Sequence, residues 1–187
     1  MKELTGIYRQ KSALQTLVSN LVLQSQPRLV LKFPFGMLSS EVDAILNSLC
    51  QKTLNVTTGP PYHQILYAFR ISHNDFRGAA TILYERLQRL KSSSSKVHDP
   101  ADESMVQCYM LLINTLSSVR EEEAYILAEQ RLDESNWGIG KAKKMLKRQI
   151  VTLEMLRKEY AAELDRVAAI ENGQYPFVDA GDEMDIL

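Results

Sequence analysis

Hydrophobic residues recur every three or four positions along most of the chain, with polar residues between them. This spacing places the apolar side chains on one face of a helix and is typical of amphipathic helices packed on a core. Residues 28–33 lack the spacing and lie between Pro27 and Pro34, so we expect a loop of extended character there. The pattern predicts helices over about 4–24, 39–56, 62–72, 76–90, 99–116, 121–134 and 141–170.

The connections between these helices indicate how they are arranged. The helices at 62–72 and 76–90 are joined only by a turn at Asn74, and a connection this short makes them antiparallel neighbours. The small side chains of Ala79 and Ala80 would let the two backbones approach closely. The sequence therefore predicts an all-α fold of stacked antiparallel helix pairs, an irregular TPR-like α-solenoid that ends in a long helix.

The long terminal helix carries a regular apolar stripe. Its apolar residues follow one another at intervals averaging about 3.4 residues, close to the 3.5-residue period of coiled-coil seams. The stripe is longer than the apolar face of any earlier helix, so we expect part of it to extend beyond the chain's own core and to be covered by a helix of another subunit. The alternative is that the helix at 4–24 folds back and covers it. The stripe comprises Leu146, Ile150, Leu153, Leu156, Tyr160, Leu164, Val167 and Ile170.

The candidate partner-binding residues are the later part of this stripe together with the tryptophan. Trp137 precedes Gly138 and is either a loop anchor packed on a neighbour or an exposed interface residue, since tryptophan is enriched at binding hot spots. The hypothesis names Leu153, Leu156, Tyr160, Leu164, Val167 and Trp137.

Composition and charge limit the function classes. The chain has 187 residues, with 22 Lys and Arg against 23 Asp and Glu and a net charge of -1. This balance disfavours a dedicated nucleic-acid-binding protein or attraction to an anionic membrane. Two cysteines exclude a disulfide scaffold, and no apolar run is long enough to span a membrane. We expect one helical domain over 1–175 and an acidic, flexible tail over 176–187, in a protein of the cytoplasm or nucleus.

No arrangement of residues points to catalysis, a metal or a cofactor. The histidines, His63, His73 and His98, are too far apart in the sequence for a metal site of the usual spacing. The segment 138–141 lacks the first glycine and the hydroxyl residue of a phosphate-binding loop. A basic cluster at 141–148 could contact phosphates, and a catalytic site assembled from scattered residues stays open. We therefore expect a non-enzymatic protein without a cofactor or small-molecule ligand.

Three segments resemble the helical region of the nucleoporin one-sixty (fungal one-twenty) family. The stretch from Pro61 to Ala80 contains the Leu-Tyr-Ala-Phe sequence of a family helix, then a turn and a helix of the aromatic–Arg–small–Ala type. The segments 107–114 and 151–166 are similar to later helices of the same region. The resemblance extends over residues 60–175.

The resemblance implies a structural subunit of the Y-shaped scaffold complex of the nuclear pore, at the nuclear envelope. Members of the family have an N-terminal β-propeller followed by a long helical region that meets other Y-complex subunits. This chain shows no propeller-like strand repeats, so it would be a C-terminal piece of a larger protein. The implied partners are other Y-complex nucleoporins, and the implied role is support of protein and mRNA transport. The alternative is a generic helical-repeat module that binds proteins or nucleic acid.

Overall fold

Helices make up most of the chain that the computed structural model describes, which comprises residues 2–24, 26–53, 55–93, 103–130 and 147–172. The helices are α1 (Lys2–Leu23), α2 (Pro27–Lys32), α3 (Ser39–Lys52), α4 (Tyr62–Ser72), α5 (Phe76–Ser93), α6 (Ser104–Ser117) and α7 (Leu153–Glu171). The shorter elements are two single-turn 3-10 helices, η1 (Gly36–Leu38) and η2 (Glu121–Glu123), and two strands, β1 (Tyr125–Gln130) and β2 (Lys147–Thr152).

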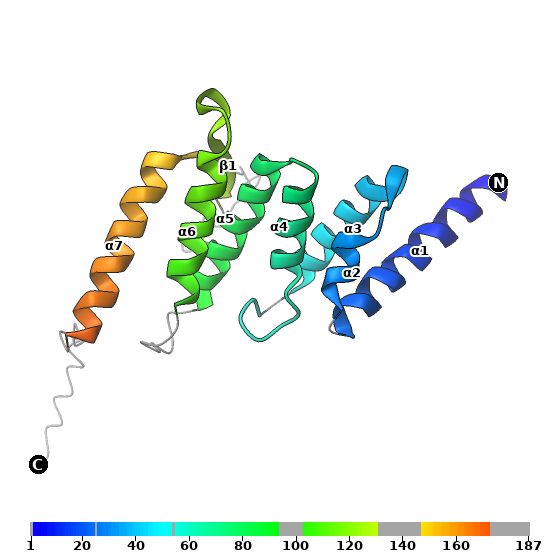
Figure 1. The fold of residues 1–187 in the computed structure, drawn as a ribbon, viewed down its shortest axis with the longest axis horizontal. Coiled ribbons are helices and arrows are strands. Elements are labelled where there is room, and N and C mark those ends of the chain that lie inside the picture. The colour runs from blue at the N-terminus through cyan, green and yellow to red at the C-terminus, as the bar shows by residue number, and fades with distance from the viewer. Residues whose placement is uncertain (1, 25, 54, 94–102, 131–146, 173–187) are drawn as a thin grey trace, which may run out of the picture.

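The helices stand side by side in one elongated array, with α1 at one end and α7 at the other (Figure 1). Along this array α3 packs on α1, α4 on α3, α5 on α4, α6 on α5 and α7 on α6, while the short α2 contacts α1 and α4. Each helix therefore contacts chiefly its neighbours in sequence, which is the arrangement of a helical solenoid. The predicted stack of helices is confirmed.

The turn between α4 and α5 confirms the predicted helix pair. Asn74 adopts a left-handed backbone conformation with φ 61°, which asparagine tolerates better than most residues. The Asp75 carboxylate then accepts a hydrogen bond from the Gly78 backbone N–H at 2.9 Å and caps the first turn of α5. A Cβ atom at Gly78 would lie 2.0 Å from a carboxylate oxygen of Asp75, so this capping contact depends on glycine.

A half-buried arginine joins three successive helices. The Arg70 guanidinium of α4 donates to both carboxylate oxygens of Asp43 in α3, at 2.7 and 2.9 Å. Its remaining terminal nitrogen donates to the Gly78 carbonyl of α5 at 2.9 Å. Bidentate pairs of this kind fix geometry as well as adding energy, so Arg70 sets how α3, α4 and α5 are stacked.

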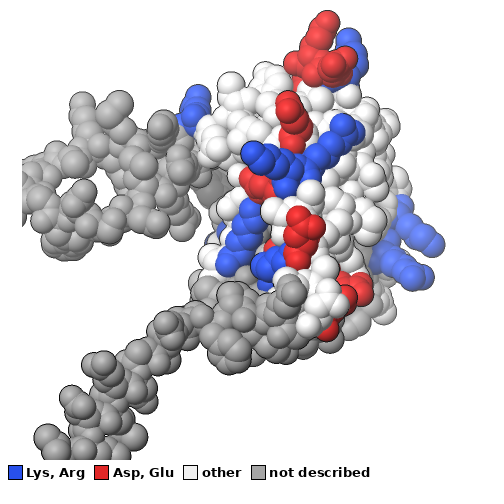
Figure 2. All heavy atoms as spheres, turned by 90° about the vertical axis from the view of Figure 1, so that its left-hand side faces the viewer, with Lys and Arg blue, Asp and Glu red and all other residues white. Residues whose placement is uncertain are grey.

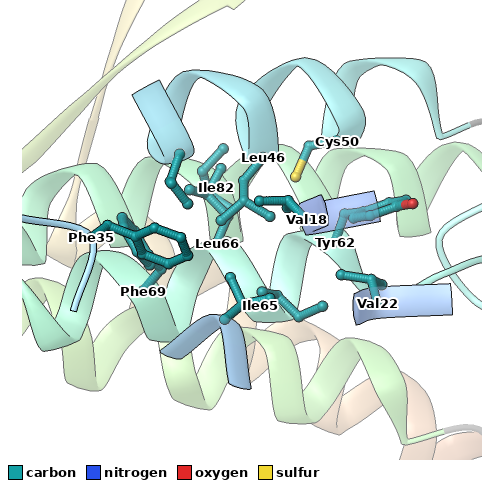
Figure 3. Packing of buried hydrophobic residues seen from close by; sticks show 12 residues of the cluster. Val18, Val22, Phe35, Leu46, Cys50, Tyr62, Ile65, Leu66, Phe69 and Ile82 are labelled. Atoms are coloured by element: carbon teal, nitrogen blue, oxygen red, sulfur yellow. The ribbon is translucent and has the colours of Figure 1, made fainter. Parts of the chain in front are cut away.

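Two hydrophobic clusters fill the array, and α5 contributes to both. In the first, among α1 to α4, the side chains of Leu46, Leu66 and Ile82 meet near the centre (Figure 3). The second joins α5 and α6 to the strands and α7, and it includes Ala80 and Leu112. Since Ile82 belongs to one cluster and Ala80 to the other, α5 is buried on two sides.

Replacing Ala80 by leucine should lower the free energy of unfolding by about 1–3 kcal/mol, the usual effect of overpacking a core. Ala80 has no exposed surface and lies within the second cluster. The matched control is Ala161→Leu, at an exposed position of α7, which should leave stability nearly unchanged. Urea denaturation measures both variants, and equal midpoints for the two would contradict the packing of α5 against its neighbours.

Residues 28–33 form a helix for the most part, where the sequence pattern predicted an extended loop. Pro27 begins α2, and proline suits the first helical position because its fixed φ is already helical and no N–H is needed there. Val30 is fully buried in the first cluster. Tertiary packing of that side chain therefore stabilises the helix. With six residues, α2 is too short to show a hydrophobic period in the sequence.

The segment from η2 to the start of α7 also differs from the prediction. The described part of the helix predicted at 121–134 is a 3-10 turn followed by β1, and the helix predicted from Lys141 begins instead at Leu153. The two strands pair antiparallel, with Tyr125 opposite Thr152 and Gln130 opposite Lys147.

The β2 sequence explains this difference. Ile150, Val151 and Thr152 are three consecutive β-branched residues, which favour a strand over a helix. The Thr152 hydroxyl then accepts a hydrogen bond from the Met155 backbone N–H at 3.4 Å and starts α7. The predictions for Leu146, Trp137, the helix start at Asp99 and the tail at 176–187 fall outside the described residues.

Candidate protein-interaction surface

A polar cluster holds the middle of α7 against the array. Glu159 of α7 accepts hydrogen bonds from the Lys91 ammonium of α5 at 2.7 Å and from the Tyr109 hydroxyl of α6 at 3.0 Å. The Tyr160 ring packs 5.9 Å from the Tyr109 ring, centroid to centroid. Burial raises the pKa of Tyr109 to about 12, in keeping with a neutral hydroxyl that donates to the Glu159 carboxylate. Together these contacts determine which face of α7 turns inward.

The inward face of α7 takes up part of the predicted stripe. Leu156 is fully buried in the second cluster, and the partly exposed Leu153 and Tyr160 pack against that cluster. Leu164 is 42% exposed, and Val167 is half-buried. Of the candidate interface residues, Leu156 therefore belongs to the chain's own core, whereas Leu164 is accessible to a partner.

The alternative in which the N-terminal helix covers the stripe is wrong. That helix is α1, which packs on α2 and α3 and lies at the opposite end of the array from α7 (Figure 1). The outer surface at the α7 end carries Lys and Arg side chains interleaved with Asp and Glu, and uncharged surface lies beside them (Figure 2). A partner on this surface would meet both signs of charge.

The β1–β2 hairpin is attached to α5 through an arginine. The Arg77 Nε atom donates a hydrogen bond to the Tyr125 carbonyl at 3.2 Å, and the guanidinium lies 4.2 Å from the centroid of the Tyr125 ring. A cation over an aromatic ring is attracted to its face. The start of β1 is therefore fixed to the helical array by two contacts between the same residues.

The two faces of the hairpin differ in exposure. Ile126 and Val151 lie opposite each other in the register, and both are buried in the second cluster. Because successive side chains of a strand point to opposite faces, the next pair, Leu127 and Ile150, faces outward. Leu127 is 48% exposed and Ile150 is 57% exposed. The hairpin thus presents an apolar cross-strand pair to its surroundings.

A groove of about 660 Å³ lies between the hairpin, the end of α6 and the start of α7. Among the predicted interface residues that the structure describes, Leu153 alone lines it, and Leu164 and Val167 lie further along α7. Its apolar lining consists of Leu116, Val119, Ala124, Ile150 and Leu153.

Sequence reasoning missed this groove because it assigned Ile150 to a helical stripe. The β-branched run that ends at Thr152 and the glycines at 138 and 140 were the available signals. Two short apolar runs separated by turn residues are typical of a hairpin.

Both cysteines and the histidine His63 lie in the interior, whereas the other described histidine, His73, is exposed. Cys50 and Cys108 are buried, and burial raises the pKa of their thiols to about 12 and about 11. His63 is buried in α4, and burial lowers its pKa to about 4. Across the residues that the structure describes, no group of three or more His, Cys, Asp or Glu could hold a metal ion. None of the helices described is long and apolar enough to cross a bilayer.

An array of helices in which each packs chiefly on its neighbours in the sequence defines a helical-repeat protein. The chain belongs to the NUP160/120 nucleoporin family, whose middle TPR domain matches residues 1–117. The family resemblance carried by the sequence is thereby confirmed. The matching domain is described as middle TPR, whereas the resemblance implied the C-terminal helical region.

The relatives are nucleoporins from fungi and animals. Nucleoporin NUP120 of Chaetomium thermophilum is 30% identical over 94% of this chain and 20% of its own length. Nucleoporin nup120 of Schizosaccharomyces pombe is 27% identical over 84% of this chain and 14% of its own length. Nuclear pore complex protein Nup160 of Mus musculus is 32% identical over 64% of this chain and 8% of its own length. The chain thus spans a fifth or less of the length of these relatives.

Proposed function

We propose that this chain is a non-enzymatic structural module of the nuclear pore scaffold, located at the nuclear envelope, where it binds other nucleoporins of the Y complex and so supports protein and mRNA transport. The observation that carries the proposal is the family match over residues 1–117. The stack of helices adds support, since an extended array of this kind offers a long surface for other proteins.

The chemistry of the described residues agrees with a binding role. A nucleophilic cysteine needs a lowered thiol pKa and solvent access, whereas burial raises the pKa of Cys50 and Cys108. A histidine that acts as a general base needs access to its substrate; His63 is 3% exposed, and the exposed His73 has its Nδ1 atom 2.8 Å from the Phe69 carbonyl oxygen of its own helix. Binding of other proteins requires none of these groups.

The second candidate function, nucleic-acid binding, rests on the basic cluster at 141–148. Of that cluster the structure describes only its last two residues, in β2. Arg148 is exposed and lies opposite Glu129 in the hairpin register. The other basic residues of the cluster, 141–144, lie outside the described residues, so the family match and not the cluster favours the protein-binding role.

Leu164→Asp should abolish binding of the nucleoporin partners and lower the free energy of unfolding by under about 1 kcal/mol, the usual range for a surface change. Leu164 is 42% exposed near the end of the array that α7 forms. The measurement is capture of nucleoporins from nuclear extract, identified by mass spectrometry, combined with thermal melting of the same protein. The wild-type chain should retain Y-complex nucleoporins.

The matched control is Leu29→Asp, at a similarly exposed leucine of α2 near the opposite end of the array. It should melt like the wild type and retain the same partners. If Leu164→Asp unfolds, that leucine is internal core; if it folds and binds normally, the interface lies elsewhere. A wild-type chain that captures no nucleoporin would contradict the proposed function itself.

A further inference from the structure

The groove beside the hairpin combines an apolar floor with an exposed apolar wall. Leu116 and Leu153 lie in its lining, and Ile150 enters it from β2. Ile150 is paired across the hairpin with Leu127, and both side chains are about half exposed. Neighbouring apolar side chains that remain in water mark sites where another molecule can be buried. The surface is therefore suited to an apolar ligand.

The dimensions of the groove limit the kind of ligand. Its volume of about 660 Å³ falls in the range that holds a few side chains or a small organic molecule. A second folded domain would need a broad, continuous interface, whereas charged side chains of both signs are spread over the surface at the α7 end of the array (Figure 2). A short peptide segment fits both the volume and the shape.

Two of the three charged residues in the described lining of the groove are acidic. Glu121 and Glu154 line it together with Arg157. Glu122 and Glu123 follow Glu121 in η2, and all three of these consecutive glutamates are exposed. Neither Glu121 nor Glu154 forms a salt bridge with another residue that the structure describes. A ligand with a positive charge would complement this rim, and one with a negative charge would be repelled by it.

We propose that this groove binds a short peptide segment of a partner protein that carries aliphatic or aromatic side chains and at least one lysine or arginine. The apolar side chains pack on Ile150 and Leu153, and the cation lies near Glu121 and Glu154. The inference rests on the proposed function in that it names one kind of partner segment for a protein-binding module.

The location of the groove distinguishes it from the rest of the array. The family match ends at residue 117, and within the groove only Leu116 and Ser117 fall inside the matched range. The hairpin and the start of α7 supply the remaining lining. The groove is therefore a feature of the segment that follows the matched domain, and its ligand is not implied by that match.

Selection from a library of short random peptides displayed on phage, against the full 187-residue chain, tests the proposal. The enriched peptides should carry two or more aliphatic or aromatic residues and at least one lysine or arginine. The strongest peptide, labelled with a fluorophore, should bind the wild-type chain in an anisotropy titration. Ile150→Asp should weaken its binding about tenfold or more, which is about 1.4 kcal/mol, because the aspartate puts a charge into the apolar wall.

Two further variants complete the test. Glu154→Arg should weaken binding of that peptide and should improve binding of a synthetic version in which glutamate replaces its basic residues. Met37→Asp, at the exposed η1 on another part of the array, should bind like the wild type. All variants are checked by thermal melting.

Three outcomes would overturn the proposal: no enrichment, enrichment of acidic peptides, or unchanged binding by a folded Ile150→Asp protein. If Ile150→Asp fails to fold, the Glu154→Arg variant decides the test. The proposal is then contradicted if this variant still prefers the basic peptide over its glutamate version as strongly as the wild type does. Nucleoporin capture by the wild-type chain is measured separately, so failure of the groove does not affect the proposed scaffold function.

Discussion

Replacing Leu156 by alanine should lower the free energy of unfolding by about 2–5 kcal/mol, the usual range for removing a fully buried leucine. The same replacement at Leu164 should lower it by under about 1 kcal/mol. Both leucines lie on α7, but Leu156 has no exposed surface and Leu164 is 42% exposed. The Leu156 side chain packs in the second cluster, so its removal leaves a cavity between α6 and α7.

Urea denaturation of the two variants measures both effects. The dependence of the unfolding free energy on urea concentration should be the same for both, which shows that neither variant changes how much surface is exposed on unfolding. The two leucines are a matched pair, since each variant loses the same atoms from the same helix. Equal losses of stability would contradict the division of the stripe into an inward and an outward part. A large loss at Leu164 alone would mean that α7 is turned about its axis so that Leu164, and not Leu156, faces the core.

The stability of the chain should fall by about 2 kcal/mol between about pH 7.5 and about pH 5 through His63 alone. Burial lowers the pKa of this imidazole from 6.5 to about 4 in the folded protein, with Arg89 and Arg86 adding to the effect. Its Nε2 atom makes no hydrogen bond with any residue that the structure describes. The unfolded chain therefore binds a proton that the folded chain cannot accommodate.

The contribution has a definite sign and pH window. Because the folded pKa lies below the unfolded one, the stability from a neutral His63 is complete above about pH 6.5 and is lost as the pH falls toward about 4. Urea unfolding of the wild type and of His63→Leu at several pH values isolates the effect, since the carboxylates contribute equally to both proteins. Parallel pH profiles would contradict a buried neutral imidazole.

The sequence predicted the helices that combine a complete apolar face with clear end signals. The helices α4 and α5 were assigned within a few residues because Asn74 and Asp75 separate two periodic runs. For α2 the local pattern was too short, and the burial of Val30, which is a tertiary effect, decided its conformation. Such an effect depends on where α1 and α4 lie, and no short stretch of sequence contains that information.

The secondary structure that carries the candidate stripe was predictable only from Leu153 onward. Leu164 and Val167 lie on a continuous helix, where a period near 3.5 places residues correctly. Ile150 and Leu153 are also three residues apart, but β2 ends between them, so helical spacing across a strand boundary was a coincidence. Short apolar runs cannot be assigned by period alone. Here the contacts of Arg77 and the burial of Ile126 and Val151 select the hairpin.

The shared position of α5 has a consequence for how the array comes apart. A solenoid whose layers touch only their neighbours can lose its layers one at a time from either end. Loss of either half of this chain would expose one apolar side of α5, the side of Ile82 or the side of Ala80. The remaining half would then carry a water-exposed core helix, so the two halves favour a single cooperative transition. If the chain is part of a larger scaffold, a force applied between α1 and α7 would pass through the contacts that α5 makes with both halves. The array would then resist separation of its two halves.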